Sequence, residues 1–163
     1  MNTILSTDPK TDEGLVISCL IDAPRAAVFA AWTNSDYLAK WWGPTGFTNP
    51  VCQIDPTPGG AIYIEMCGPD GTIYPMNGAV LEVQTPSRFG FASSALGSDG
   101  QPMFTVHTTV DFDEKSGKTE LLMRARLLEI FSDNASAALE GMPVGWSQTL
   151  DRLAAFAAGG DEC

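Results

Sequence analysis

The sequence predicts an α+β fold in which one curved antiparallel sheet of seven strands wraps around a long C-terminal helix. Between residues 47 and 129 the apolar residues recur with a period of two, which is typical of strands, and the turns are too short for parallel crossovers. Trp41 and Trp42 end a short helix just before a Gly-Pro break, and Trp146 opens a long amphipathic helix. The sheet must cover one apolar face, and this helix is the large element left to do so.

Two short helices are expected after the first strand, which we place at residues 13–23. Pro24 suits the start of a helix over 25–32, because its missing N–H has no helical partner there. The segment Asn34-Ser35-Asp36 supplies capping oxygens for a second helix, which Gly43-Pro44 ends.

Six further strands are predicted from alternation and from turns rich in Gly, Pro, Asp and Ser. The clearest is 61–67, where Ile62, Ile64 and Met66 share one face. The six strands are expected at 48–55, 61–67, 73–83, 88–94, 103–112 and 118–129.

The last element is a helix in two parts. Ser132-Asp133-Asn134 can cap its beginning, and Gly141-Met142-Pro143 is expected to kink or interrupt it. No linker or internal repeat divides the chain. The sequence thus predicts one domain over 13–158, with a flexible leader at 1–12 and a tail at 159–163.

Composition limits the functions available. The net charge of −11 disfavours nucleic acid and anionic membrane surfaces as partners. No apolar run approaches the ~20 residues of a membrane span, and no signal peptide is recognisable. The four cysteines lack metal-like spacing, so we expect an acidic, reduced, cytoplasmic protein with no metal and no cofactor. A homodimer is compatible with exposed strand edges.

Catalytic motifs are not recognisable in the sequence. The single histidine, His107, shares its strand face with Thr105 and Thr109, which we interpret as the solvent side. No nucleophile elbow, P-loop or dinucleotide fingerprint is present. An enzyme would have to use Glu65, Tyr63, Tyr74 or His107, and we assign no catalytic residue.

Binding is better supported than catalysis. A strongly curved sheet closed by one helix leaves volume that side chains fill with difficulty, and methionines suit a pocket that adapts to apolar guests. We expect a small hydrophobic molecule to bind between sheet and helix. The predicted ligand-binding residues are Trp42, Phe47, Met66, Met76, Phe91, Val106, Met123, Met142, Trp146 and Leu150.

Several segments carry a family resemblance: APRAAVFAAWTNSDYLAKWWGPTGF, PGG, GPDGTIYPMNG and GMPVGWSQTLDRLAAF. With them, residues 13–158 resemble the bacterial single-domain members of the activator of heat-shock protein 90 ATPase homologue-like family, within the START-like (SRPBCC) superfamily. The resemblance implies a helix-grip fold, with seven strands around the C-terminal helix, and a deep, largely hydrophobic cavity.

The resemblance leaves three functions open, because fold alone does not fix function. The first is a START-like binding protein for a small hydrophobic or aromatic molecule. The second is an enzyme of the polyketide-cyclase or hydrolase kind that acts on a ring-containing substrate. The third is a co-chaperone; the eukaryotic co-chaperone of this family has a separate N-terminal domain, whereas here twelve residues precede the first predicted strand.

Overall fold

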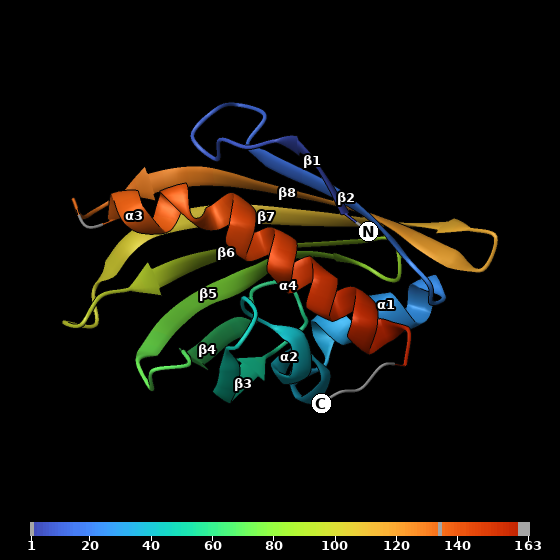
Figure 1. Cartoon of the computed structure of the whole chain (residues 1–163), viewed down its shortest axis with the longest axis horizontal. Coiled ribbons are helices and arrows are strands. Elements are labelled where there is room, and N and C mark those ends of the chain that lie inside the picture. The colour runs from blue at the N-terminus through green and yellow to red at the C-terminus, as the bar shows by residue number, and fades with distance from the viewer. Residues whose placement is uncertain (1, 134, 160–163) are drawn as a thin grey trace.

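An eight-stranded antiparallel sheet, β1-β2-β8-β7-β6-β5-β4-β3 in order across it, forms the body of the protein (Figure 1). The structure is a computed structural model, and it describes residues 2–133 and 135–159. Strands β2 and β8, the first and last of the strands predicted from the sequence, are antiparallel neighbours in the sheet. The strands are β1 Asn2–Ser6, β2 Leu15–Ile21, β3 Thr48–Ile54, β4 Ala61–Cys67, β5 Ile73–Gln84, β6 Arg88–Leu96, β7 Pro102–Lys115 and β8 Lys118–Ile130.

The sheet therefore has one strand more than the seven that the sequence predicts. The additional strand is β1, which lies in the segment predicted to be a flexible leader and pairs with β2 through Thr3–Ser18 and Ile4–Ile17. Its short, mostly polar sequence has no clear alternation. The strand forms because the outer edge of β2 offers unpaired backbone groups, a tertiary effect that local pattern does not reveal.

The other strands lie where alternation places them, within a few residues. The largest difference is at the end of β7, which is predicted to stop at residue 112 and continues to Lys115, where it forms a hairpin with β8. Their link is the pair Ser116 and Gly117, with φ values of 55° and 83°. Positive φ at both central residues gives a turn whose twist matches the strands, so the ladder continues to Lys115 and Lys118.

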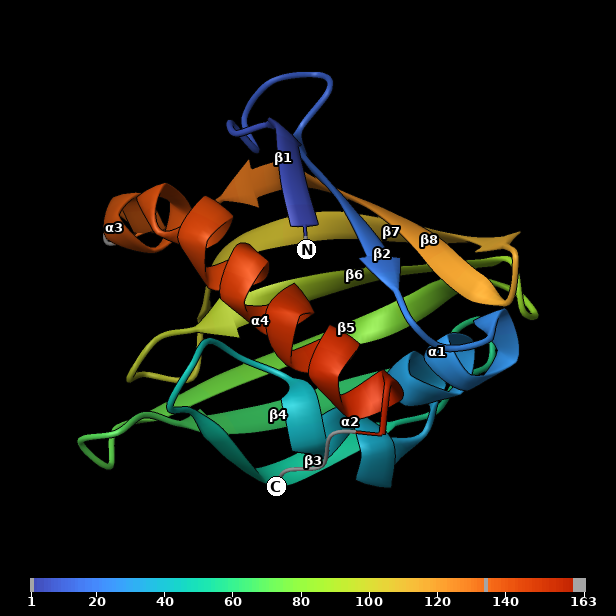
Figure 2. The ribbon, with the colours of Figure 1, turned by 45° about the vertical axis from the view of Figure 1, so that its right-hand side comes forward.

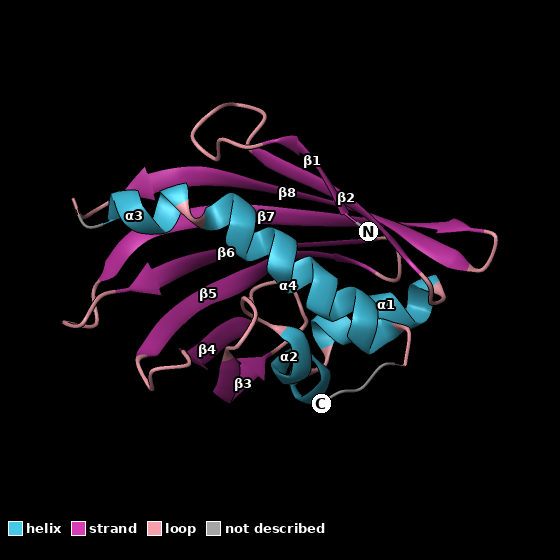
Figure 3. Ribbon diagram, in the orientation of Figure 1, coloured by secondary structure: helices cyan, strands magenta, loops and turns pink. Residues whose placement is uncertain are grey.

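The helices lie on one side of the sheet (Figure 3). In the second helix the Asn34 side chain accepts hydrogen bonds from the backbone N–H groups of Asp36 and Tyr37, as the predicted cap requires. The predicted interruption is also present, because α3 ends just before Gly141 and Pro143 lies in the first turn of α4. Asn134 and residues 160–163 lie outside the described residues. The helices are α1 Arg25–Thr33, α2 Ser35–Trp41, α3 Ala135–Glu140 and α4 Met142–Ala157.

Helix α4 crosses the concave face diagonally, with α1 and α2 at one end and α3 at the other (Figure 2). It makes close contacts with β1, β2, α1 and α2. Its buried face carries Thr149, Leu150 and Leu153 against the apolar face of the sheet. The fold thus fixes α4 along one side of the sheet, and this arrangement positions the candidate site.

Candidate functional site

A hollow of about 270 Å³ lies between the α3–α4 segment and strands β4 to β7. We call it the sheet-side hollow and define it by Met66, Met76, Met103, Val106, Met142 and Trp146. Because α4 packs closely only along β1 and β2, this part of the concave face lacks a tight helical cover. A sealed dry void of this size would cost about 6 kcal/mol. The hollow is open to solvent, so a guest or water can occupy it.

A second hollow of about 390 Å³ adjoins the first, on the other side of Met66, Met142 and Trp146. We call it the loop-side hollow, since the segment after α2 forms one wall. It is defined by Trp42, Pro44, Phe47, Gly141, Gly145 and Thr149. Met66, Tyr74, Ala138, Met142 and Trp146 line both hollows, so the two form one continuous region around these side chains.

Arg152 of α4 fixes the wall of the loop-side hollow. Its Nη1 donates to the carbonyl oxygens of Trp42 at 3.1 Å, Gly43 at 2.8 Å and Pro44 at 3.0 Å. These carbonyls follow the C-terminal end of α2, where the helix dipole favours a cation. Burial lowers the pKa of the Arg152 guanidinium, but an arginine remains charged in proteins. Arg152 thus ties the turn after α2 to α4.

Further contacts hold the same turn. The Asn49 side-chain amide donates to the carbonyl oxygen of Trp42 at 2.8 Å, and the Thr45 N–H donates to Oε1 of Gln148 at 3.2 Å. Gly43 has a φ of 97°, a left-handed conformation that glycine adopts without strain. A Cβ atom at this position would also lie only 3.1 Å from Sδ of Met66, so glycine allows the turn to approach the hollow.

An aromatic cluster lies beside Met66, which lines both hollows. Trp146 stacks on Trp32, with ring centroids 6.2 Å apart and 18° between the planes, and meets Trp42 edge-on at 5.3 Å. Trp32 is 1% exposed, so the half-buried Trp146 packs against the hydrophobic core. Aromatic pairs of this geometry add to the stability that burial alone gives. The three indole rings thus form a packed layer between the hollows and the core.

Seven of the ten predicted ligand-binding residues come together at the hollows. Five line the sheet-side hollow: Met66, Met76, Val106, Met142 and Trp146. Trp42 and Phe47 line the loop-side hollow.

The structure does not bring the other three, Phe91, Met123 and Leu150, to either hollow. Met123 and Leu150 are 0% exposed and pack in the core, on the side where α4 lies tightly against the sheet. Phe91 borders only a void of about 10 Å³ next to Trp32 and Trp42. Alternation places Phe91 and Met123 on the concave face correctly, and helical spacing places Leu150 on the buried face of α4, but neither pattern tells which part of the sheet the helix covers.

Of the four residues considered for catalysis, only Tyr74 borders the hollows. Its ring lies 5.7 Å from that of Phe47. Tyr63 and Glu65 lie on the other face of β4, where the tyrosine hydroxyl donates to the Glu65 carboxylate at 2.6 Å. This hydrogen bond is the main reason why the pKa of Tyr63 is raised.

His107 lies on the outer face of the sheet, as alternation predicts, opposite Ala92 and Arg126. Burial is the main cause that lowers its pKa, and the charges of Arg126 and Arg88 lower it further. It is separated from the hollows by the sheet itself, because its neighbours Val106 and Thr108 point to the concave side.

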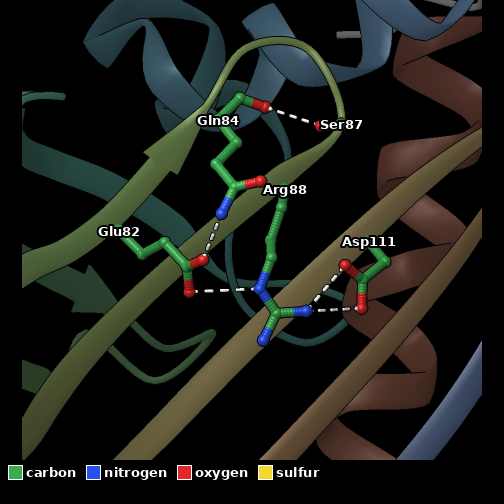
Figure 4. Close-up of polar contacts among 5 residues, drawn as sticks. All are labelled: Glu82, Gln84, Ser87, Arg88 and Asp111. Atoms are coloured by element: carbon green, nitrogen blue, oxygen red, sulfur yellow. Dashed lines mark hydrogen bonds and ion pairs between the residues drawn. The ribbon is translucent and has the colours of Figure 1, made fainter.

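The outer face also carries the most connected group of charged side chains, shown in Figure 4. Nη1 of Arg88 donates to both carboxylate oxygens of Asp111, at 2.7 and 2.9 Å, and Nε donates to Glu82 at 3.1 Å. Gln84 donates to the same Glu82 at 2.6 Å. These contacts join β5, β6 and β7 on the face opposite the hollows, so we assign them to the sheet and not to the site.

The hollows themselves have an uncharged lining: among the described residues, none of the side chains that line them is charged. Nor do any three His, Cys, Asp or Glu side chains in the described ranges lie close enough to hold a metal ion. The arrangement can therefore enclose an apolar guest, and its polar atoms are hydroxyls and backbone groups.

Several residues that line the sheet-side hollow are absent from the predicted ligand-binding set, among them Met103, Ser93 and Thr108. Thr108 could have been found from alternation in β7, where Phe104, Val106 and Val110 share the concave face, whereas alternation assigns Met103 to the opposite face. Ser93 lies opposite Val106 in the neighbouring strand. Its contribution depends on strand register, which the sequence does not specify for a segment as small and polar as Ala92–Ala95.

Residues 22–158 match the family described as Activator of Hsp90 ATPase homolog 1-like protein. The chain belongs to this family. The match begins just after β2 and includes the turn after α2, the middle strands and α4, so the whole of both hollows lies within it. None of the curated proteins compared with the chain matches it.

Solved structures of bacterial proteins support the family assignment. The AHSA1 protein of Silicibacter pomeroyi is 26% identical, with a TM-score of 0.72 over 90% of this chain and 99% of that one. A protein of Chromobacterium violaceum is also 26% identical, with a TM-score of 0.72 over 88% of this chain and 96% of that one. A protein of Arthrobacter aurescens, 23% identical, shares the fold with a TM-score of 0.79 over 96% of this chain and 93% of that one.

The helices give no indication of a membrane span. None of those in the described part of the chain is both long enough and apolar enough to cross a bilayer.

Proposed function

We propose that this member of the family binds a small hydrophobic or aromatic molecule between the sheet and the α3–α4 segment. The observation that carries the proposal is the uncharged lining of the two adjoining hollows, with four methionines and Trp146 around the sheet-side one. Methionine side chains are flexible and polarizable, so they adapt to guests of different shape. A pocket of this size and composition is typical of small-molecule sites.

The binding proposal is favoured over an enzyme. Acid–base catalysis requires at least one positioned proton carrier near its working pKa, and hydrolysis requires a nucleophile with a base. Tyr74 is the one candidate at the hollows, whereas Glu65 and His107 lie across the sheet. A cyclase or hydrolase would need a further group that the lining does not supply.

Native mass spectrometry of freshly purified protein is the first test. A bound mass that survives purification and is released on denaturation would support the proposal and give the chemical class of the ligand. A second test uses the neutral fluorophore 1-aminoanthracene, which is taken up by apolar pockets and becomes brighter there. Titration into the protein is expected to give saturable binding at one site.

Two matched variants in β6 locate that site. Ala95 lines the sheet-side hollow, whereas Ala92 lies on the opposite face, paired with His107. Ala95→Phe fills the hollow and is expected to weaken 1-aminoanthracene binding by about tenfold or more, whereas Ala92→Phe leaves it unchanged. Equal affinity in both variants, with thermal unfolding showing that both are folded, would contradict the proposal.

A further inference from the structure

Ser93 and Thr108 contribute hydroxyl side chains to the sheet wall of the sheet-side hollow, which Tyr74 and Ser94 also line. Thr108 is 1% exposed, and its neighbours on the same strand face are Val106 and Val110. Across the strands it faces Phe91 and Ala125. A hydroxyl in such surroundings loses water on folding, and it gains nothing from the apolar groups around it.

The two hydroxyls are close enough for one molecule to reach both. Phe91 pairs with Thr108 and Ser93 pairs with Val106, so Ser93 and Thr108 are diagonal neighbours on the concave face. Such neighbours lie about 7–8 Å apart in an antiparallel sheet. Both line the sheet-side hollow, with Thr108 toward the packed core and Ser93 toward the open end of the strands.

No hydrogen bond joins either side chain to another described residue, and neither oxygen is fully sealed, since the sealed polar atoms without a partner in the described ranges are Trp32 Nε1 and Asn49 Oδ1; both hydroxyls therefore remain accessible from the hollow. Other hydroxyls of this sheet and of α4 do have partners: Ser94 bonds Thr105 at 2.7 Å on the outer face, and Thr149 donates to the carbonyl oxygen of Gly145 at 2.7 Å. Buried polar groups in folded proteins are nearly always paired. The partners of Ser93 and Thr108 are therefore to be sought in whatever occupies the hollow.

We propose, on the basis of the binding function above, that the ligand is a neutral amphiphile: an apolar ring or chain with a hydroxyl or carbonyl oxygen at one end. That oxygen hydrogen-bonds with Thr108 and Ser93 at the inner end of the hollow, and the apolar body lies against Met142 and Trp146. A charged ligand is disfavoured, because no described side chain of opposite charge lines the hollow and a buried unpaired charge costs several kcal/mol.

The test compares two probes of the same shape, 2-naphthol and 2-methylnaphthalene, as competitors of 1-aminoanthracene. Thr108→Val removes the hydroxyl and keeps the shape of the side chain. The matched control is Thr109→Val, one residue further along β7 on the outer face, opposite Gly90 and Arg124. In Thr108→Val the Kd of 2-naphthol is expected to rise about fivefold relative to that of 2-methylnaphthalene, the loss of one hydrogen bond. In Thr109→Val the ratio of the two Kd values stays at its wild-type value.

Ser93→Ala is a second variant with the same expected direction, and it keeps the inference testable if Thr108→Val does not fold. An unchanged ratio of Kd values in both folded variants would overturn the inference while the binding function stands. The same holds if both probes weaken equally, since that result means altered packing. Absence of saturable 1-aminoanthracene binding to the wild-type protein would overturn the binding function, and the inference with it.

Discussion

The indole rings of Trp32 and Trp146 are stacked, with centroids 6.2 Å apart and 18° between their planes. Trp32 belongs to α1 and is buried in the hydrophobic core, and Trp146 belongs to the first turns of α4. This stack joins the helix wall of both hollows to the buried core. The size of the hollows is therefore set by packing that a ligand does not have to create, which lowers the cost of ordering on binding.

Removing the Trp146 ring tests this wall directly. Trp146→Ala is expected to lower the free energy of unfolding by about 2–4 kcal/mol, since burial and the contacts with Trp32 and Trp42 are lost together. It should also weaken 1-aminoanthracene binding by about tenfold. Trp146→Phe, which keeps an aromatic ring, should recover most of both effects. If neither urea unfolding nor the titration distinguishes Trp146→Ala from the wild type, Trp146 is not part of the wall.

Arg152 provides the second structural test. Arg152→Ala leaves the carbonyls of Trp42, Gly43 and Pro44 without their donor, and we expect a loss of about 2 kcal/mol in the free energy of unfolding. Amide hydrogen exchange should speed up first at residues 43–47, before the sheet is affected. Arg124→Ala, at an exposed position of β8, is the matched control and should change stability by less than about 0.5 kcal/mol. Equal effects of the two substitutions would show that Arg152 does not hold the turn.

The ion pairs on the outer face are expected to matter much less. Arg88 and Asp111 form the shortest pair at 2.7 Å, but their side chains are 34% and 45% exposed. A double-mutant cycle with Arg88→Met and Asp111→Asn should give a coupling energy below about 1 kcal/mol, and 0.5 M NaCl should reduce it. A salt-independent coupling of several kcal/mol would contradict this expectation and would assign the group a larger structural role.

His107 is the only histidine, so its titration can be followed without ambiguity. Its pKa is lowered in the folded protein, chiefly by burial and then by Arg126 and Arg88. The folded state therefore binds fewer protons than the unfolded state when the pH lies between the lowered pKa and the ordinary value of 6.5. Stability should fall as the pH decreases through this window. Proton NMR should give an imidazole pKa below 6.5, and His107→Gln should remove this part of the pH dependence. A value above 6.5 would contradict the assignment.

Alternation and turn composition predict most of the fold because they are local properties. The breaks at Gly43-Pro44 and at Gly141-Met142-Pro143 end or divide helices through backbone effects that any context preserves. Strand β1 could not be predicted in this way, since its pairing depends on the free edge of β2 and not on its own sequence.

In the candidate site, too, the sequence predicts the local features and not those that depend on tertiary packing. Alternation assigns Met123 and Val106 to the same concave face, yet Met123 lies under the packed part of α4 and Val106 lies in the hollow. The difference arises from the diagonal path of the helix, which is a property of tertiary packing. The role of Arg152 in holding the turn after α2 could not be predicted, because it depends on contacts between segments far apart in the sequence.

The methionine methyl groups offer the most direct measurement of ligand binding in the hollow. Met66, Met76, Met103 and Met142 line the sheet-side hollow, whereas Met123 is 0% exposed in the core and serves as an internal control. With ¹³C-methyl-labelled methionine, titration of 1-aminoanthracene is predicted to shift the four methyl signals of the hollow and to leave that of Met123 in place. Unchanged signals from the four, or a shift centred on Met123, would contradict binding between the sheet and α4.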